Sequence, residues 1–520
     1  MKENYDKPKR IASNTIVLFV RMFVLTIINL YAVRLVLRGL GQEDYGIFNT
    51  VAAVVLATNF FGGVLTLSIQ RFYSIAIGKH NEQELRKIFS ASMVIMVFLS
   101  VFLIVLFETI GLWCVNHWLV IPIESMPAVN WVYQFTMLGF ICSLLQIPYM
   151  AAIFTHEDMG GYTVISTLEC LLKLATAFLI GIVFVDRLVL YSAGLFVTAM
   201  IVLLLYGCSA SHQYAECHYT KCNEKQIYKG LLSFSGWTLF GSIAGTGIIQ
   251  GNALLLNLFY GPFAMAAYGI AMNINNAFGA LCNSMVLSFR PVMIQSYAEA
   301  NYGFLNQIFS ACNKSILYIL IIVSLPIISQ MNTILSLWLG DPITTEMVLF
   351  GQLVIIYTVF MALHNPITTI IQATGHVKEY HVSVESCTLL CLPLTWLLFH
   401  LGLPSHALFF SMITVTVLAH IIRIFCLKKF YPHFSINQYV CSFLFRGVIL
   451  ILIGFILTQV LNYAKFPALP QLLLSFIVIP IFMLLLAYLI GFEHNEKKLI
   501  HKMVLQPIKN KFFHIHKQTT

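Results

Sequence analysis

The segment LRKIFSAS at residues 85–92 recurs as LNQIFSAC at residues 305–312, 220 positions further along the chain. The triplet YGI at residues 45–47 likewise recurs at residues 268–270, at an offset of 223. Small changes of offset are what insertions in loops or at helix ends leave behind. We therefore interpret the pattern as an internal repeat and predict two related halves.

The composition excludes an ordinary soluble protein. Of the 520 residues, 59% are hydrophobic and 10% are charged, whereas soluble globular chains carry about 25% charged residues. A helix needs about 20 apolar residues to cross the hydrocarbon layer. About fourteen stretches meet this requirement, at residues 11–36, 45–69, 88–113, 129–154, 162–184, 188–208, 231–257, 264–288, 308–330, 346–371, 381–402, 405–425, 438–461 and 469–491.

The basic residues predict the topology. If the N-terminus is cytoplasmic, 22 Lys and Arg residues fall in cytoplasmic segments, and three fall outside, namely Arg38, Arg187 and Lys465. Cytoplasmic loops retain positive charge, so this bias predicts that both termini are cytoplasmic. The net charge of +9 is explained in this way, and no nucleic-acid partner is expected.

The predicted fold class is an all-α polytopic membrane protein with about fourteen transmembrane helices. Six spans separate the two copies of the repeat, so matched positions lie on the same side of the membrane. This is a parallel repeat, an arrangement known among transporters. The predicted parts are an N-terminal lobe of helices 1–6 (residues 1–210), an inter-lobe loop (211–230) and a C-terminal lobe of helices 7–12 (231–430). Helices 13–14 (431–495) and a basic tail (496–520) follow.

Several short motifs carry a resemblance to a known family. They are LG at 40–41 with DYGI at 44–47, QRF at 70–72, IP at 147–148 with EDM at 157–159, and LSLWLG at 335–340. In this order the motifs resemble those of the polysaccharide flippases in the multidrug/oligosaccharidyl-lipid/polysaccharide exporter (MOP) superfamily. The resemblance covers roughly residues 8–430.

The resemblance implies a MATE-like, V-shaped pair of six-helix lobes around a central cavity. It also implies a bacterial inner-membrane flippase for polysaccharide biosynthesis, whose cargo is an oligosaccharide repeat unit on polyprenyl pyrophosphate. Such a flippase works by alternating access, beside the polysaccharide polymerase machinery. One alternative is a multidrug or organic-cation exporter of the same superfamily. The other, from a different class, is a membrane-embedded glycosyl- or acyltransferase.

Arg21 is the most informative charge in the predicted helices. It lies ten residues, or about 15 Å, into the first span, and no acidic residue occurs within four positions of it. A charge at membrane depth is costly and needs a partner or a wet cavity. A guanidinium suits bidentate contact with phosphate, so we expect Arg21 to bind the anionic head group of the cargo. The alternative is a structural pair with an acid on another helix.

Amides and two further arginines complete the predicted substrate site. Gln250 and Asn252 follow a Gly- and Ser-rich stretch of the seventh span, and Asn273 and Asn276 share a helical face in the eighth. These amides serve either as contacts to sugar hydroxyls or as hydrogen bonds between helices. Arg71 and Arg290 occupy near-equivalent repeat positions at cytoplasmic helix ends, where they either receive the pyrophosphate or anchor the topology.

Other charged residues have structural or coupling interpretations. Glu169 and Lys173 stand four apart in the favourable order for a helical ion pair. They form either a neutralised pair or a labile pair that opens when substrate or a proton arrives. A coupling ion, if there is one, would be H+ or Na+. Lys314 and Arg446 are expected to snorkel or to find a packing partner.

No enzyme motif is convincing. No Gly-rich phosphate loop with a following Lys is present, so ATP hydrolysis by this chain is not expected. His364, in the tenth span, is expected to be a buried structural histidine. No cofactor and no metal site are predicted. The first and seventh spans contain no carboxylate, which favours an anionic cargo over an organic cation.

Overall fold

The computed structural model describes residues 3–78, 82–156, 158–182, 186–220, 222, 224–340, 343–464 and 466–493. Side chains are described from Val24 onward, with gaps that include Arg71 and residues 233–240.

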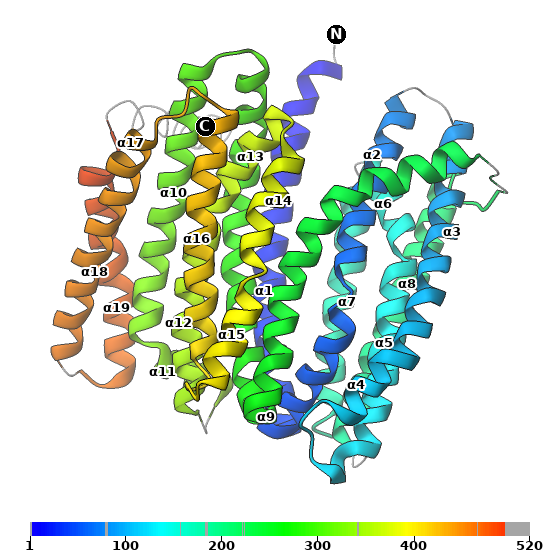
Figure 1. Cartoon of the computed structure of the whole chain (residues 1–520), viewed down its shortest axis with the longest axis horizontal. Helices are drawn as coiled ribbons and strands as arrows, with labels where there is room; N and C mark the ends of the chain where they lie inside the picture. The colour runs from blue at the N-terminus through cyan, green and yellow to red at the C-terminus, as the bar shows by residue number, and fades with distance from the viewer. Residues whose placement is uncertain are drawn as a thin grey trace, which may run out of the picture. The chain divides into compact units, whose positions relative to one another are not determined.

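The described secondary structure is helical and contains no β-strand (Figure 1). Twelve of the described helices are long and apolar enough to cross a membrane. A helix satisfies all its backbone groups within one segment, as a lipid environment requires. The predicted fold class is confirmed.

Two long kinked helices account for most of the difference from fourteen spans. Helix α1 (Glu3–Leu56) contains the first predicted span and the start of the second, and α9 (Lys225–Ala298) contains the seventh and eighth. Each is interrupted by one glycine with a left-handed backbone, Gly41 at φ 83° and Gly261 at φ 73°. Only glycine adopts this conformation without strain. A single kinked residue therefore stands where a loop was predicted.

The chain divides into two compact units. Unit 1 comprises residues 1–270, 338–340 and 388–411. Besides α1 and the first part of α9, it contains α2 (Phe60–Gly78), α3 (Glu82–Leu106), α4 (Leu112–His117), α5 (Met126–Leu145), α6 (Ile147–Thr155), α7 (Met159–Leu179), α8 (Arg187–Gln213) and α15 (Cys391–His400). The predicted lobes with a boundary at residues 211–230 divide the chain by its repeat and stay a prediction.

Unit 2 comprises residues 271–337, 341–387 and 412–520. It contains the second part of α9 with α10 (Tyr302–Ser329), most of α11 (Met331–Leu339), α12 (Thr345–Ala362), α13 (His364–Thr374), most of α14 (Val377–Thr388), most of α16 (Ala407–Phe430), α17 (Ile436–Tyr439), α18 (Phe445–Tyr463) and α19 (Ala468–Leu486).

The element boundaries repeat at the offset found in the sequence. Matched helices begin at matched positions, at Glu82 and Tyr302 for α3 and α10, at Met159 and Val377 for α7 and α14, and at Arg187 and Ala407 for α8 and α16. The kinks at Gly41 and Gly261 are related by the same offset and have a similar backbone conformation. This agreement confirms the predicted parallel repeat. It also shows that equivalent residues begin equivalent helices.

Helix breaks before two prolines belong to the same repeat. Helix α5 ends at Leu145 and α6 begins at Ile147, just before Pro148. Helix α12 similarly ends at Ala362 and α13 begins at His364, shortly before Pro366. Proline removes a backbone donor and clashes with the preceding turn. The prolines therefore separate the two helices of each pair.

The two copies of the YGI motif meet in unit 1. A Cβ atom placed on Gly46 would overlap the backbone oxygen of Pro262, and one on Gly269 would lie 2.7 Å from Asn49 Nδ2. Glycine is required at position 46 because the neighbour is a backbone atom, whereas a side chain at position 269 would require the Asn49 side chain to move. The motif is thus a packing element in which each copy contacts the other half of the repeat.

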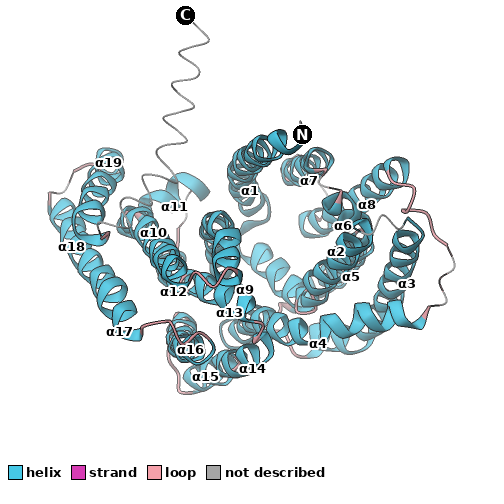
Figure 2. Ribbon diagram, turned by 90° about the horizontal axis from the view of Figure 1, so that it is seen from above, coloured by secondary structure: helices cyan, strands magenta, loops and turns pink. Residues whose placement is uncertain are grey.

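Helices α18 and α19 pack against each other and against α10 (Figures 1 and 2). Gly454 of α18 faces Leu325 of α10 so closely that a Cβ atom on the glycine would overlap the leucine side chain. A small residue at such an interface lets two helices approach. The C-terminal helix pair is therefore a tightly packed part of unit 2.

Candidate functional site

The predicted substrate residues fall in both units. Arg21, Arg71, Gln250 and Asn252 belong to unit 1, and Asn273, Asn276 and Arg290 belong to unit 2. The side chains of Arg21 and Arg71 lie outside the described residues. A cavity that joins these residues stays a prediction.

Asn252 is a buried packing residue of unit 1. Its side chain is fully buried, and its Nδ2 donates to Cys391 Sγ of α15 at 3.5 Å. Cys391 Sγ lies 3.8 Å from Ser411 Oγ, which is 2.5 Å from Thr395 Oγ1. This contact is a hydrogen bond between two helices, α9 and α15, and contact of Asn252 with sugar stays a prediction.

The other predicted amides are more accessible. Gln250 and Asn273 are half-buried, and Asn276 is exposed, as is Asn283 further along α9. Two exposed amides seven positions apart lie on the same side of a helix. This arrangement suits polar ligands, and the sugar-binding role of the three predicted residues stays a prediction.

Arg290 is engaged by a neighbouring helix. Its Nη2 donates to Gln372 Oε1 of α13 at 2.6 Å, in an exposed position. The partner that the structure describes for this guanidinium is a neutral amide. The role of Arg290 as a phosphate contact stays a prediction.

Glu169 and Lys173 form the predicted ion pair. Lys173 Nζ lies 2.6 Å from Glu169 Oε1, and the lysine and glutamate side chains are 44% and 32% exposed. The distance agrees with a neutralised i,i+4 pair. This exposure differs from the burial that a costly internal switch requires.

A buried arginine in unit 2 was not recognised as a site residue. The count of 22 cytoplasmic charges includes Arg423, which lies at the end of the predicted span at residues 405–425. In the structure it lies inside α16 and is only 6% exposed. Its Nε donates to Tyr380 Oη at 3.0 Å, and its Nη1 donates to His364 Nε2 at 3.1 Å. No carboxylate is among the partners that the structure describes for Arg423.

The histidines beside Arg423 define its surroundings. Because His364 Nε2 accepts from an arginine, its proton lies on Nδ1 and the ring is neutral. The rings of His364 and His420 lie 5.8 Å apart, and His420 Nε2 is 3.2 Å from Tyr439 Oη. Neutral groups on α13, α14 and α16 thus hold a permanent buried cation. His364 was predicted to be a buried structural histidine, and it is buried. In the sequence, the signal that indicates this cluster is the spacing of His420 and Arg423, which lie three positions apart on one helix face.

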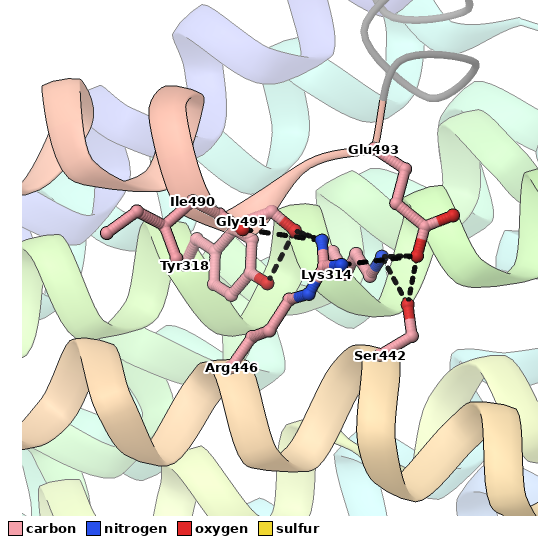
Figure 3. A network of polar contacts seen from close by, with 7 residues as sticks. All are labelled: Lys314, Tyr318, Ser442, Arg446, Ile490, Gly491 and Glu493. Atoms are coloured by element: carbon pink, nitrogen blue, oxygen red, sulfur yellow. Dashed lines mark hydrogen bonds and ion pairs between the residues drawn. The ribbon is translucent and has the colours of Figure 1, made fainter.

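A second buried cation joins the C-terminal helices to the repeat. Lys314 of α10 is fully buried, and its Nζ lies 2.8 Å from Ser442 Oγ and 3.8 Å from Glu493 Oε1 (Figure 3). Ser442 donates to the same carboxylate oxygen at 2.7 Å. This hydrogen bond and the charges of Lys314 and Arg446 lower the pKa of Glu493 against the effect of burial.

Arg446 completes this network from α18. Its Nη2 lies 3.6 Å from Glu493 Oε1, and its Nη1 donates to the backbone oxygens of Ile490 and Gly491 at 3.3 and 3.2 Å. Tyr318 of α10 donates to the same oxygen of Gly491 (Figure 3). The packing partner predicted for Lys314 and Arg446 is therefore Glu493, which follows the last helix.

Comparisons with known proteins identify the fold. The MatE family model matches residues 252–397. No curated protein sequence matches this chain. A structure of the lipid II flippase MurJ in an inward closed conformation is 14% identical, with a TM-score of 0.67, and covers 91% of this chain and 99% of that chain.

Two further solved structures have the same fold. An inward-facing multidrug resistance MATE family transporter of the MOP superfamily is 13% identical with a TM-score of 0.61, over 79% of this chain and 96% of that chain. A MOP superfamily transporter from Pyrococcus furiosus is 12% identical with a TM-score of 0.55, over 80% of this chain and 95% of that chain. These likenesses confirm the predicted resemblance to the superfamily at the level of fold.

Proposed function

Since the chain contains a MatE segment and has the fold of the MOP-superfamily transporters, we propose that it is a flippase for a polyprenyl-pyrophosphate-linked oligosaccharide. The proposed location is the bacterial cytoplasmic membrane, with both termini in the cytoplasm. The two halves of the repeat would alternate access to the two leaflets. The proposed coupling ion is a proton or sodium, and the proposed protein partner is the polysaccharide polymerase machinery.

The observation that carries the proposal is the sign of the charge in the helices. The first and seventh predicted spans contain no carboxylate, while the first contains Arg21. Unit 2 adds Arg423, a buried cation held by neutral groups. A carrier of organic cations needs a carboxylate in its path, whereas a pyrophosphate carrier needs uncompensated guanidinium groups.

The extent of the structural likeness also supports a lipid-linked cargo. The MurJ structure covers 91% of this chain, whereas the MATE transporter of the MOP superfamily covers 79%. The difference is large enough to hold one helix pair, and the described residues include such a pair near their C-terminal end, α18 and α19. MurJ is a flippase of lipid II, and the proposal extends a lipid-linked cargo to this chain.

The proposal is tested with the purified chain in proteoliposomes that contain a fluorescent polyprenyl-pyrophosphate oligosaccharide. We expect movement between leaflets, loss of movement in Arg21→Ala, and partial movement in Arg21→Lys, because a point charge replaces a bidentate fork. Arg34→Ala on the same helix is the matched control and should remain active. Normal transport by Arg21→Ala would refute the role of Arg21. Transport of ethidium without transport of the oligosaccharide would identify a multidrug exporter instead.

A further inference from the structure

Unit 2 contains a half-open cleft between the start of α10 and the segment that leads from α16 into α18. Its empty volume is about 390 Å³ when the open space at its mouth is included. No charged side chain lines it. The lining residues are aromatic or carry a neutral amide or hydroxyl, namely Asn306, Phe309, Ser310, Asn313, Phe434, Ser435, Gln438, Tyr439 and Phe443.

The aromatic rings form one continuous wall of the cleft. Phe309 meets Phe434 edge-on at 5.8 Å and stacks with Tyr439 at 6.1 Å. Tyr439 in turn lies 4.9 Å from the ring of Phe443. Lys428 Nζ donates to the backbone oxygens of Pro432 and Phe434, both at 2.8 Å, and so fixes the loop that carries this wall.

Asn313 contributes an unused acceptor to the cleft. Its side chain is 1% exposed, and its Nδ2 donates to the backbone oxygen of Phe309 at 2.8 Å. Its Oδ1 is buried without a hydrogen-bond partner in the described structure. Buried acceptors are nearly always satisfied in folded proteins. The acceptor therefore calls for a donor supplied from the cleft.

The first half of the repeat lacks this site. Ser90 is the equivalent of Ser310, and the backbone N–H of Thr220 donates to Ser90 Oγ at 2.9 Å. In unit 1 the inter-lobe segment thus covers the position that opens into the cleft in unit 2. Met93 replaces the amide of Asn313. The polar lining is a property of the second half and not of the repeated fold.

We propose that this cleft binds a neutral polyhydroxylated ring, that is, one sugar residue. Aromatic faces suit the apolar side of such a ring, while the amides of Asn313 and Gln438 suit its hydroxyls. The lining has no carboxylate for an ammonium group and no cation for a phosphate. The sugar comes either from free solution or from the head group of a glycolipid. The site lies within unit 2 and does not depend on the proposed flippase activity.

The test uses the full chain in phosphatidylcholine nanodiscs, with methyl β-D-glucopyranoside as the probe and saturation-transfer NMR as the readout. We expect transfer from aromatic protons of the protein to the sugar. Asn313→Leu and Gln438→Ala should each weaken binding about fivefold or more, the loss of one hydrogen bond. Asn437→Ala, on α17 but outside the lining, is the matched control. If Asn313→Leu does not fold, the exposed Gln438 still decides the outcome.

A second arm identifies the source of the sugar. Nanodiscs that contain a monoglucosyl diacylglycerol should suppress transfer to the free glucoside if the head group is the natural ligand. They should leave it unchanged if the ligand is a free sugar. Either result supports the site. No transfer to wild type, or equal transfer in wild type and both lining variants, would overturn it.

Discussion

Replacing Glu493 by glutamine should destabilise unit 2, because a fully buried lysine loses its counter-charge. Lys314 Nζ and Glu493 Oε1 are 3.8 Å apart, and at an effective dielectric constant of about 20 their attraction is roughly 4 kcal/mol. The side chain of Glu493 is 43% exposed, so water screens about half of this attraction. The expected loss in the free energy of unfolding is therefore about 2 kcal/mol.

A double-mutant cycle isolates the pair from its surroundings. Lys314→Met should cost less than Glu493→Gln, because an apolar side chain fills the buried position and the exposed carboxylate remains hydrated. The double variant should regain most of the loss, which gives a coupling energy of about 1–2 kcal/mol. The assay is thermal unfolding of the detergent-solubilised chain, in which about 2 kcal/mol corresponds to a fall of about 4–8 °C for a unit of this size.

Additivity would refute this reasoning. If Lys314→Met and Glu493→Gln lower Tm independently, the ion pair does not stabilise the packing of the C-terminal helices. Ser442→Ala is an internal check, because Ser442 hydrogen-bonds both partners. It should lower Tm in wild type and have a smaller effect in the double variant.

Three other outcomes are expected. The pKa of Glu493 is lowered from its ordinary value of 4.5 in the folded protein, so the carboxylate contributes its full stabilisation above pH 4.5 and loses it as the pH falls through the folded-state pKa. Tm measured from about pH 6 to about pH 3 should show this loss in wild type but not in Glu493→Gln. Gly46→Ala, whose Cβ would overlap a backbone oxygen, should cost about 3 kcal/mol, whereas Gly247→Ala, which meets no described atom within 4 Å, should leave the denaturation midpoint unchanged. Glu169→Gln removes a half-exposed pair with Lys173 and should cost less than about 0.5 kcal/mol; if the pair couples transport, the variant's transport should no longer respond to collapse of the ion gradient.

The repeat made much of the fold predictable. The sequence matches at a nearly constant offset located equivalent helix starts, including those of α3 and α10. The sequence did not reveal that Gly41 and Gly261 replace loops by kinks within continuous helices. A glycine between two apolar stretches is compatible with either outcome, and packing of the adjoining helices selects between them.

The candidate site was less predictable because its contacts are distant in sequence. Hydropathy and loop counting treat each charge by its position along the chain. They group Arg423 with the cytoplasmic charges at the end of a span, although His364 and Tyr380 from two other helices contact it. They likewise could not pair Lys314 with Glu493, because five long helices of the chain separate the two residues in sequence.

The C-terminal helices explain why a lysine is tolerated at position 314. Val94 of α3 is its equivalent in the first half, and it lies on an exposed apolar face that continues through Phe98. Phe98 is 75% exposed, whereas its counterpart Tyr318 is 2% exposed beneath the end of the last helix. Helices α18 and α19 therefore cover in unit 2 the face that the first half leaves to its surroundings. Glu493 follows directly after these two helices and pairs with Lys314. A lysine that would be costly on a lipid-facing helix therefore joins α10 to α18 and α19.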